Sequence, residues 1–177
     1  MNNIMKKIII VFMIALCAIA CKPKADFNKL VKSDYSEALG EFPDSTIKFY
    51  EVQTVLDKPI TEKVEPIYLS ASSTIIQIGF DKLKKIDRLY KNGRIKKENV
   101  TYLDNAHWME DFELPVDSIN INLDGAIKTF RDSGYFPEST YMTLRKPVAP
   151  PFKRGYFFGS EQTFYVTVDA ITGDLRK

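Results

Sequence analysis

"GYFPEST" occupies residues 134–140, and the chain contains a near copy, "GEFPDST", at residues 40–46. Gly, Phe, Pro, Ser and Thr recur in register, and an acidic residue stands between Pro and Ser in both copies. Glycine is favoured just beyond a helix, and proline prevents the helix from resuming. Each copy therefore predicts a junction at which a helix ends and a strand begins.

Helical periodicity precedes both copies. Apolar residues at helical spacing predict an amphipathic helix over about 27–39, with Gly40 as its C-terminal cap. These residues are Phe27, Leu30, Val31, Tyr35, Ala38 and Leu39. A second helix is predicted between Asn122, which suits an N-cap, and Gly134, which suits a C-cap. Its apolar stripe consists of Leu123, Ala126, Ile127 and Phe130.

Extended segments follow each helix. In the first half they are IKFYEVQTVL (47–56), STIIQIGF (73–80), IDRLY (86–90) and RIKKENVTY (94–102). The last two flank Asn92-Gly93, the pair that a type I′ hairpin turn prefers, because both turn residues need positive φ. In the second half, strands are predicted at about 139–146, 154–159 and 162–170.

This order of elements predicts an α+β fold. Short connections leave no room for helical crossovers, so the strands should form one or two antiparallel β-meander sheets, with both helices packed on one face. The repeated motif has two explanations, which the sequence leaves open. Either both junctions converged on good helix-to-strand chemistry, or the chain contains two duplicated α-β-β-β lobes. The predicted divisions are a signal peptide (1–20), a lipidated tether (21–26), an N-terminal half (27–118) and a C-terminal half (119–177).

The N-terminus has the pattern of a secretory signal. Lys6 and Lys7 precede an apolar run over residues 8–16, which is too short to span a membrane comfortably. Ala18-Ile19-Ala20-Cys21 resembles a bacterial lipobox, and this implies cleavage before Cys21 and lipidation of its thiol. The alternative is a plain secretory signal with an incidental cysteine. Lipidation would anchor the protein to a membrane that the polypeptide does not cross.

The residue after the cysteine and the composition bear on location. Lys22 stands where many inner-membrane lipoproteins have Asp, which favours the outer membrane or cell surface of a Gram-negative bacterium.

Without the signal and with Cys21 lipidated, no thiol remains for a disulfide. Removing Lys6 and Lys7 from the 25 basic residues leaves 23, equal to the 23 acidic ones. The mature chain is therefore formally neutral, and its net charge does not favour nucleic acid as a partner.

The last fourteen residues, FYVTVDAITGDLRK, resemble the ending of PepSY-type domains. The residues that match the family's strand-and-turn motif are Val168, Asp169, Ala170, Thr172, Gly173, Asp174 and Leu175. The helix around Ala126-Ile127 resembles the one that precedes the family's sheet. The resemblance implies a small α+β module of secreted and membrane-anchored bacterial proteins, associated with peptidase propeptides and proposed peptidase inhibition. The long connection over 146–159 departs from the family.

The PepSY resemblance makes the C-terminal turn specific enough to test. Val166 and Val168 should pack against the second helix, while Asp169 and Thr172 should hydrogen-bond backbone groups within the turn. Gly173 should have positive φ, because the turn requires a conformation that glycine adopts without strain.

Catalytic residues are few. His107 is the single histidine, and neither a Gly-x-Ser-x-Gly elbow nor a His-Glu-x-x-His motif is present. The sequence therefore predicts no catalytic residue, no metal site and no cofactor. The leading hypothesis is a non-catalytic binding or peptidase-inhibitor-like module that acts on an envelope protein or peptide. A small envelope hydrolase and a structural or assembly lipoprotein are the alternatives.

Two features are candidates for a binding surface. The first is aromatic: Tyr156, Phe157 and Phe158, with Phe164 and Tyr165, form either a stacking surface for a peptide or sugar, or sheet core. The second is a basic hairpin that faces either anionic lipid, an acidic partner or only solvent. Its cations are Lys82, Lys84, Lys85, Arg88, Lys91, Arg94, Lys96 and Lys97. An acidic loop follows it, with Asp104, Glu110, Asp111, Glu113 and Asp117 around His107-Trp108; pairing with the hairpin or solvation is favoured over calcium binding.

Overall fold

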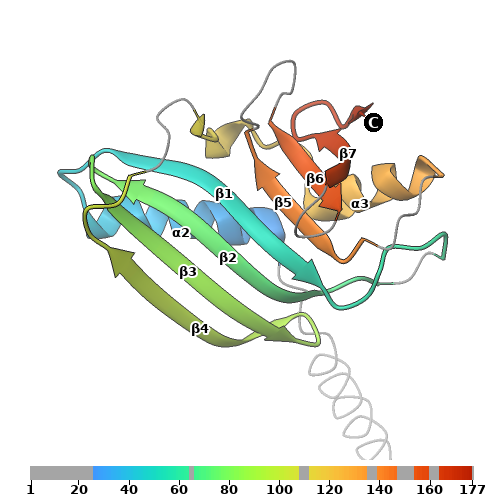
Figure 1. The fold of residues 1–177 in the computed structure, drawn as a ribbon, viewed down its shortest axis with the longest axis horizontal. Coiled ribbons are helices and arrows are strands. Elements are labelled where there is room, and N and C mark those ends of the chain that lie inside the picture. Colours follow the sequence, from blue (N-terminus) through green and yellow to red (C-terminus); the bar gives the residue numbers. More distant parts are fainter. Residues whose placement is uncertain are drawn as a thin grey trace, which may run out of the picture.

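The computed structural model describes residues 26–63, 66–107, 112–134, 139–146, 154–159 and 164–176, without the side chains of 164 and 165. All its strands join one antiparallel sheet in the order β4-β3-β2-β1-β5-β6-β7-β8 (Figure 1). The first half supplies β1 (Ile47–Leu56), β2 (Leu69–Ile78), β3 (Lys82–Lys91) and β4 (Arg94–Leu103). The second half supplies β5 (Tyr141–Arg145), β6 (Gly155–Gly159), β7 (Phe164–Asp169) and β8 (Leu175–Arg176). The α+β prediction with an antiparallel meander is confirmed.

The two halves have the same topology. In each, one helix is followed by four strands, so the predicted α-β-β-β lobe is one strand too short. The halves meet at their first strands, where β1 pairs antiparallel with β5 from Glu51↔Arg145 to Val55↔Tyr141. The strand order thus runs outward from the centre in both directions, as an internal duplication would predict.

Helix α2 spans Phe27–Glu41, and the carboxylate of Asp26 caps its N-terminus by accepting hydrogen bonds from two backbone N–H groups. The prediction that Gly40 caps the C-terminus is wrong. Gly40 lies inside the last helical turn, and the backbone N–H of Phe42 closes the helix by donating to the Ala38 carbonyl oxygen at 3.0 Å. No atom lies within 4 Å of the position that a Cβ would occupy at Gly40. Glycine in a helix costs about 1 kcal/mol relative to alanine, which the helix tolerates.

Helix α3 spans Leu123–Asp132, and Asn122 is its N-cap, as predicted, with its side chain accepting from the Gly125 N–H at 2.8 Å. Gly134 has a φ of 67°, which confirms the left-handed conformation predicted for the second copy of the motif. Residues 135–138 of that copy lie outside the described residues. A short 3-10 helix, η2 (Val116–Ser118), precedes α3.

Two predicted turns are confirmed. Asn92 and Gly93 have φ values of 53° and 71°, as the type I′ hairpin between β3 and β4 requires. In the C-terminal turn, Asp169 Oδ1 accepts from the Ile171 and Thr172 N–H groups at 2.8 and 3.1 Å. Gly173 there has a φ of 80°. The chain can therefore reverse and return β8 to pair with β7.

The core lies between the sheet and the two helices, which cover the same face in Figure 1. The rings of Phe130 on α3 and Phe158 on β6 lie 4.7 Å apart and both are fully buried. Val166 and Val168 belong to the same apolar cluster as the stripe of α3, which confirms the predicted packing. No helix among the described residues is long and apolar enough to cross a membrane.

Helix α2 packs on the sheet through ion pairs as well as apolar contacts. Arg88 of β3 donates to both carboxylate oxygens of Asp34 at 2.7 and 2.6 Å, and both side chains are buried. Thr74 of β2 donates to the same carboxylate at 3.0 Å. Leu39, predicted to belong to the buried stripe, is 42% exposed instead.

The next turn of α2 binds a buried lysine. Lys84 of β3 has no exposed side-chain surface and donates to Glu37 and Glu41 at 2.8 and 2.7 Å. Burial acts to lower the pKa of Lys84, but the hydrogen bonds that its ammonium donates to the two glutamates outweigh burial and raise the pKa. Two cations of the predicted basic hairpin therefore bind acidic residues of this same chain.

Candidate ligand-binding face

The sheet has one face covered by helices and one face without them. Successive side chains of a strand point to opposite faces. Since Arg88 points at α2, its neighbour Asp87 points away from it. The strand registers then place one side chain from each strand in a single row across the open face. The row is Asn99, Asp87, Ser73, Gln53, Thr143, Phe157, Thr167 and Arg176.

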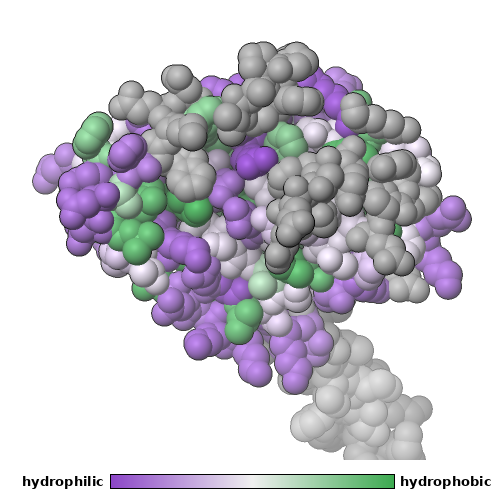
Figure 2. All heavy atoms as spheres, in the orientation of Figure 1, coloured by the Kyte–Doolittle hydropathy of each residue, from purple (hydrophilic) through white to green (hydrophobic). Residues whose placement is uncertain are grey.

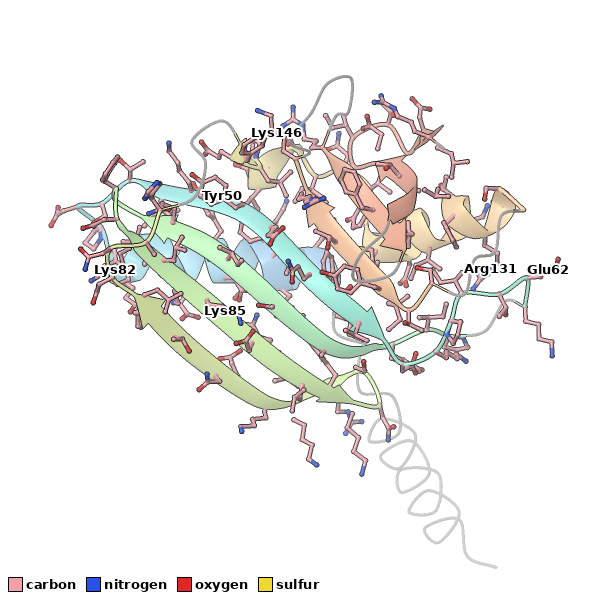
Figure 3. The ribbon with its side chains drawn as sticks, in the orientation of Figure 1. Tyr50, Glu62, Lys82, Lys85, Arg131 and Lys146 are labelled. Atoms are coloured by element: carbon pink, nitrogen blue, oxygen red, sulfur yellow. The ribbon has the colours of Figure 1, made fainter. Side chains whose placement is uncertain are left out.

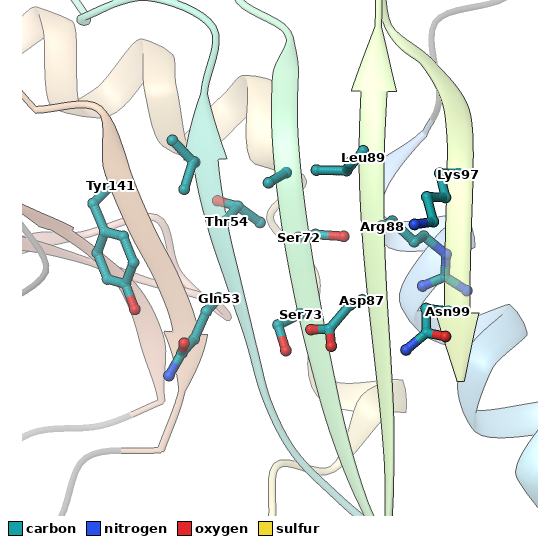
Figure 4. Close-up of a pocket in the computed structure, with 12 residues that line it drawn as sticks. Gln53, Thr54, Ser72, Ser73, Asp87, Arg88, Leu89, Lys97, Asn99 and Tyr141 are labelled. Carbon is teal, nitrogen blue, oxygen red and sulfur yellow. The ribbon is translucent and has the colours of Figure 1, made fainter. Parts of the chain in front are cut away.

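A groove of about 370 Å³ lies on this face over the first half of the sheet. Figure 4 shows its side chains arrayed from Tyr141 on β5 to Asn99 on β4. The accessible lining of the groove is mostly apolar, and amides, hydroxyls and a carboxylate are set within it. Its open-face lining includes Gln53, Ser73, Asp87, Asn99, Lys97, Leu89 and Tyr141. Lys85, labelled in Figure 3, also belongs to β3, and its ammonium lies 3.1 Å from the Asp87 carboxylate.

Two buried hydroxyls in the row have no hydrogen-bond partner among the described residues. They are Ser73 Oγ and Thr143 Oγ1, and they lie on either side of Gln53. The Gln53 amide nitrogen donates to Glu51 at 2.8 Å. Buried polar groups in proteins are nearly always hydrogen-bonded, so unpaired hydroxyls beside a groove are places where a ligand gains by binding.

A buried carboxylate lies next to this row. Glu51 is 3% exposed and stands opposite Arg145 in the β1–β5 ladder. Burial raises the pKa of the Glu51 carboxyl above its ordinary value of 4.5, although the charge of Arg145 and the hydrogen bond from Gln53 act against this. The Arg145 guanidinium also lies over the Phe157 ring, 5.3 Å from its centroid. This end of the row is therefore closely packed.

The raised pKa predicts a pH-dependent gain in stability for Glu51→Gln. Unfolded Glu51 ionises near its ordinary pKa, whereas the folded protein resists ionisation, so the wild type loses stability as pH rises through the folded-state pKa. The neutral glutamine avoids that loss. The difference in free energy of unfolding between variant and wild type should therefore become more favourable to the variant as pH rises above the ordinary pKa of 4.5. Urea denaturation at several pH values measures it.

Glu62→Gln, at an exposed position in the β1–β2 loop, is the matched control for the Glu51 series. If the wild type became more stable relative to Glu51→Gln as pH rises, attraction to Arg145 would outweigh the effect of burial on Glu51, contrary to the prediction.

The predicted aromatic surface is divided between the two faces. Tyr156 and Phe158 are fully buried on the helix face, where the Tyr156 hydroxyl donates to the Ile121 carbonyl oxygen at 2.6 Å. They are core residues and do not form a stacking surface. Phe157 lies in the open-face row but is only 5% exposed. The side chains of Phe164 and Tyr165, and all of Cys21, lie outside the described residues.

His107 lies at the other end of the strands from the groove. Its ring stacks on Phe80 with centroids 6.1 Å apart, at the turn between β2 and β3. Of the acidic loop, Asp104 lies 3.6 Å from Lys82, which is one contact of the predicted pairing with the hairpin. Residues 108–111 lie outside the described residues.

The architecture thus defines a class: an open eight-stranded antiparallel sheet, with helices on one face and a groove on the other. The fold is similar to the crystal structure of a candidate lipoprotein from Clostridium difficile 630, with a TM-score of 0.52. The similarity covers 89% of this chain and 93% of that one, at 11% sequence identity. No family model matches the sequence, and no curated protein does.

Proposed function

We propose that this chain is a lipid-anchored, extracytoplasmic binding protein that holds an extended ligand, with both apolar and polar groups, on the open face of its sheet. The ligand that fits best is a peptide segment of another envelope protein. The observation that carries the proposal is the groove, whose lining includes Ser73, a residue with a buried hydroxyl that has no partner among the described residues. Peptide backbone groups supply the regularly spaced donors and acceptors that such a row can satisfy.

The lipid anchor is supported by the residues before Cys21 and by the description of the structural neighbour as a candidate lipoprotein. Lys22 supports placement at the outer membrane or cell surface of a Gram-negative cell. The C-terminal turn supports a PepSY-like unit over residues 119–177, because Asp169, Thr172 and Gly173 take the predicted roles. Because PepSY-type domains are associated with peptidase inhibition, a peptidase that this chain would hold inactive is one candidate partner.

Hydrolysis is the alternative that a specific observation favours. Glu51 lies buried on the open face with a raised pKa, as suits a general acid. In the sheet it lies two strands away from Asp87, the carboxylate of the groove, and one row further along. If the chain is a hydrolase, Glu51→Gln should abolish turnover of the ligand. If it is a binding protein, the same variant should still retain the ligand.

Metabolic labelling with a palmitate analogue tests the anchor. The wild type should incorporate the label and sediment with membranes, whereas Cys21→Ser should do neither. Equal labelling of the two proteins would exclude lipidation at Cys21.

Site-specific photocrosslinking in cells tests the groove. A benzoylphenylalanine at Leu89 or Tyr141 should form an adduct with one protein, and the same residue at exposed Lys63 is the matched control. Ser73→Arg would place a long cation in the row and should abolish the Leu89 adduct without unfolding the sheet. Adducts that form equally from Lys63, or that survive Ser73→Arg, would contradict the proposed site.

A further inference from the structure

The cations of the basic hairpin are divided into two groups by their partners. The group nearer the β2–β3 turn is paired with carboxylates at 4 Å or less. These pairs are Lys82–Asp104, Lys84–Glu37, Lys84–Glu41, Lys85–Asp87, Arg88–Asp34 and Arg88–Glu98. The other group makes no ion pair with any residue that the structure describes. It consists of Lys91, Arg94, Lys96 and Lys97, all exposed.

The unpaired group lies at the end of the molecule where α2 begins. Along α2, Asp34 binds Arg88 and the later Glu37 and Glu41 bind the earlier Lys84, so the helix runs antiparallel to β3. Going back from Asp34 towards Phe27 therefore leads in the direction in which β3 approaches the Asn92-Gly93 turn. Figure 1 shows this hairpin at the bottom of the sheet, and hydrophilic residues gather there in Figure 2.

The chain before α2 is short. Five residues lie between Cys21 and Phe27, which makes six residue steps, and an extended chain spans about 3.3–3.6 Å per residue, so the start of α2 lies within roughly 20 Å of the acylated cysteine. The orientation argument rests on the anchor proposed above. Given that anchor, the end of the molecule that carries the unpaired cations faces the membrane.

We infer that residues 91–97, here called the hairpin tip, dock on the anionic headgroups of the membrane that holds the anchor. Four cations without a single carboxylate in this segment match a negative lipid surface. Ile95 is 44% exposed among them and supplies an apolar side chain that can enter the interfacial region. This second contact fixes the orientation of the sheet, which a single attachment point at Cys21 cannot do alone.

Vesicle binding by the unlipidated mature chain tests the inference separately from the anchor. The probe is residues 21–177 with Cys21→Ser, which keep every helix and strand described. Vesicles of phosphatidylcholine alone are compared with vesicles containing about a third phosphatidylglycerol. Each Lys or Arg near an anionic surface strengthens binding on the order of fivefold, so replacing Lys91, Arg94 and Lys96 by Gln should weaken binding on the order of a hundredfold. Lys97 is kept because it lines the groove.

The matched control replaces Lys48, Lys63 and Lys128 by Gln, which removes the same charge from β1, the β1–β2 loop and α3. We expect the control to bind like the parent chain and the binding to fall as salt screens the charges. Three results would overturn the inference: equal binding to neutral and anionic vesicles, equal loss in both triple variants, or no loss in the hairpin variant. None of them depends on acylation, so a failed palmitate experiment remains distinguishable.

Discussion

Replacing Asp34 by alanine should cost about 3–5 kcal/mol of folding free energy, the range expected when one partner of a buried ion pair is removed. The carboxylate is 2% exposed and accepts from the Arg88 guanidinium on two atoms and from Thr74. Without it, Arg88 keeps Glu98 as a partner but leaves two of its nitrogens buried without an acceptor among the described residues. Urea denaturation at neutral pH measures the loss.

Two variants separate this effect from a general loss of charge. Asp132→Ala removes an exposed helical ion pair with Lys128 and should cost only about 0.3–0.5 kcal/mol. The double variant Asp34→Leu with Arg88→Met removes both buried charges and should recover much of the loss. A cost below about 1 kcal/mol for Asp34→Ala would show that water reaches Arg88 and that α2 does not depend on this pair.

Replacing Phe130 by alanine should cost about 3–5 kcal/mol, because it removes a fully buried ring and leaves a cavity between α3 and the sheet. The lost stacking on Phe158, whose ring lies 4.7 Å away, adds to the loss. Thermal and urea unfolding should both show the change. The whole sheet should respond, since the apolar cluster runs through both halves.

Phe80→Ala is the matched control for Phe130→Ala. The side chain of Phe80 is 77% exposed at the β2–β3 turn, so the same change there should alter stability by less than about 0.5 kcal/mol. If Phe130→Ala unfolded only the second half, with the first half retaining its transition, the two halves would be independent units in spite of their shared strands.

Most of the elements could be predicted from the sequence, because their signals are local. The periodicity of Leu123, Ile127 and Phe130 predicted α3, and Asn92-Gly93 predicted the hairpin turn between β3 and β4. The number of sheets could not be predicted in the same way. It depends on pairing between β1 and β5, which are far apart in sequence and have no turn between them to set a register.

The polar packing of α2 was missed for a physical reason. Asp34, Glu37 and Glu41 are acidic residues at helical spacing, which resemble a solvated face when the helix is considered alone. Their ion pairs depend on Lys84 and Arg88, which lie on one face of a strand some 50 residues later. Both segments contain the pattern, acidic residues in α2 and basic residues in β3. It predicts the packing only when the two segments are compared by charge.

The open-face row was also invisible from single segments. Gln53, Ser73 and Asp87 each stand at an ordinary polar position of an alternating strand. Only the registers bring them into one line, and registers depend on long-range pairing. The aromatic run at residues 156–158 was the stronger local signal, yet alternation buries Tyr156 and Phe158 beneath the helices.

The contact between β1 and β5 implies how half of this molecule would behave alone. A fragment with one helix and four strands would present its first strand as an edge with unpaired backbone groups. Because β1 and β5 are antiparallel and hold equivalent positions, a second copy of the same fragment could take the missing place by a twofold rotation. Such a fragment would be expected to assemble as a symmetric homodimer with an eight-stranded sheet, and fusion of two copies into one chain would let their surfaces diverge.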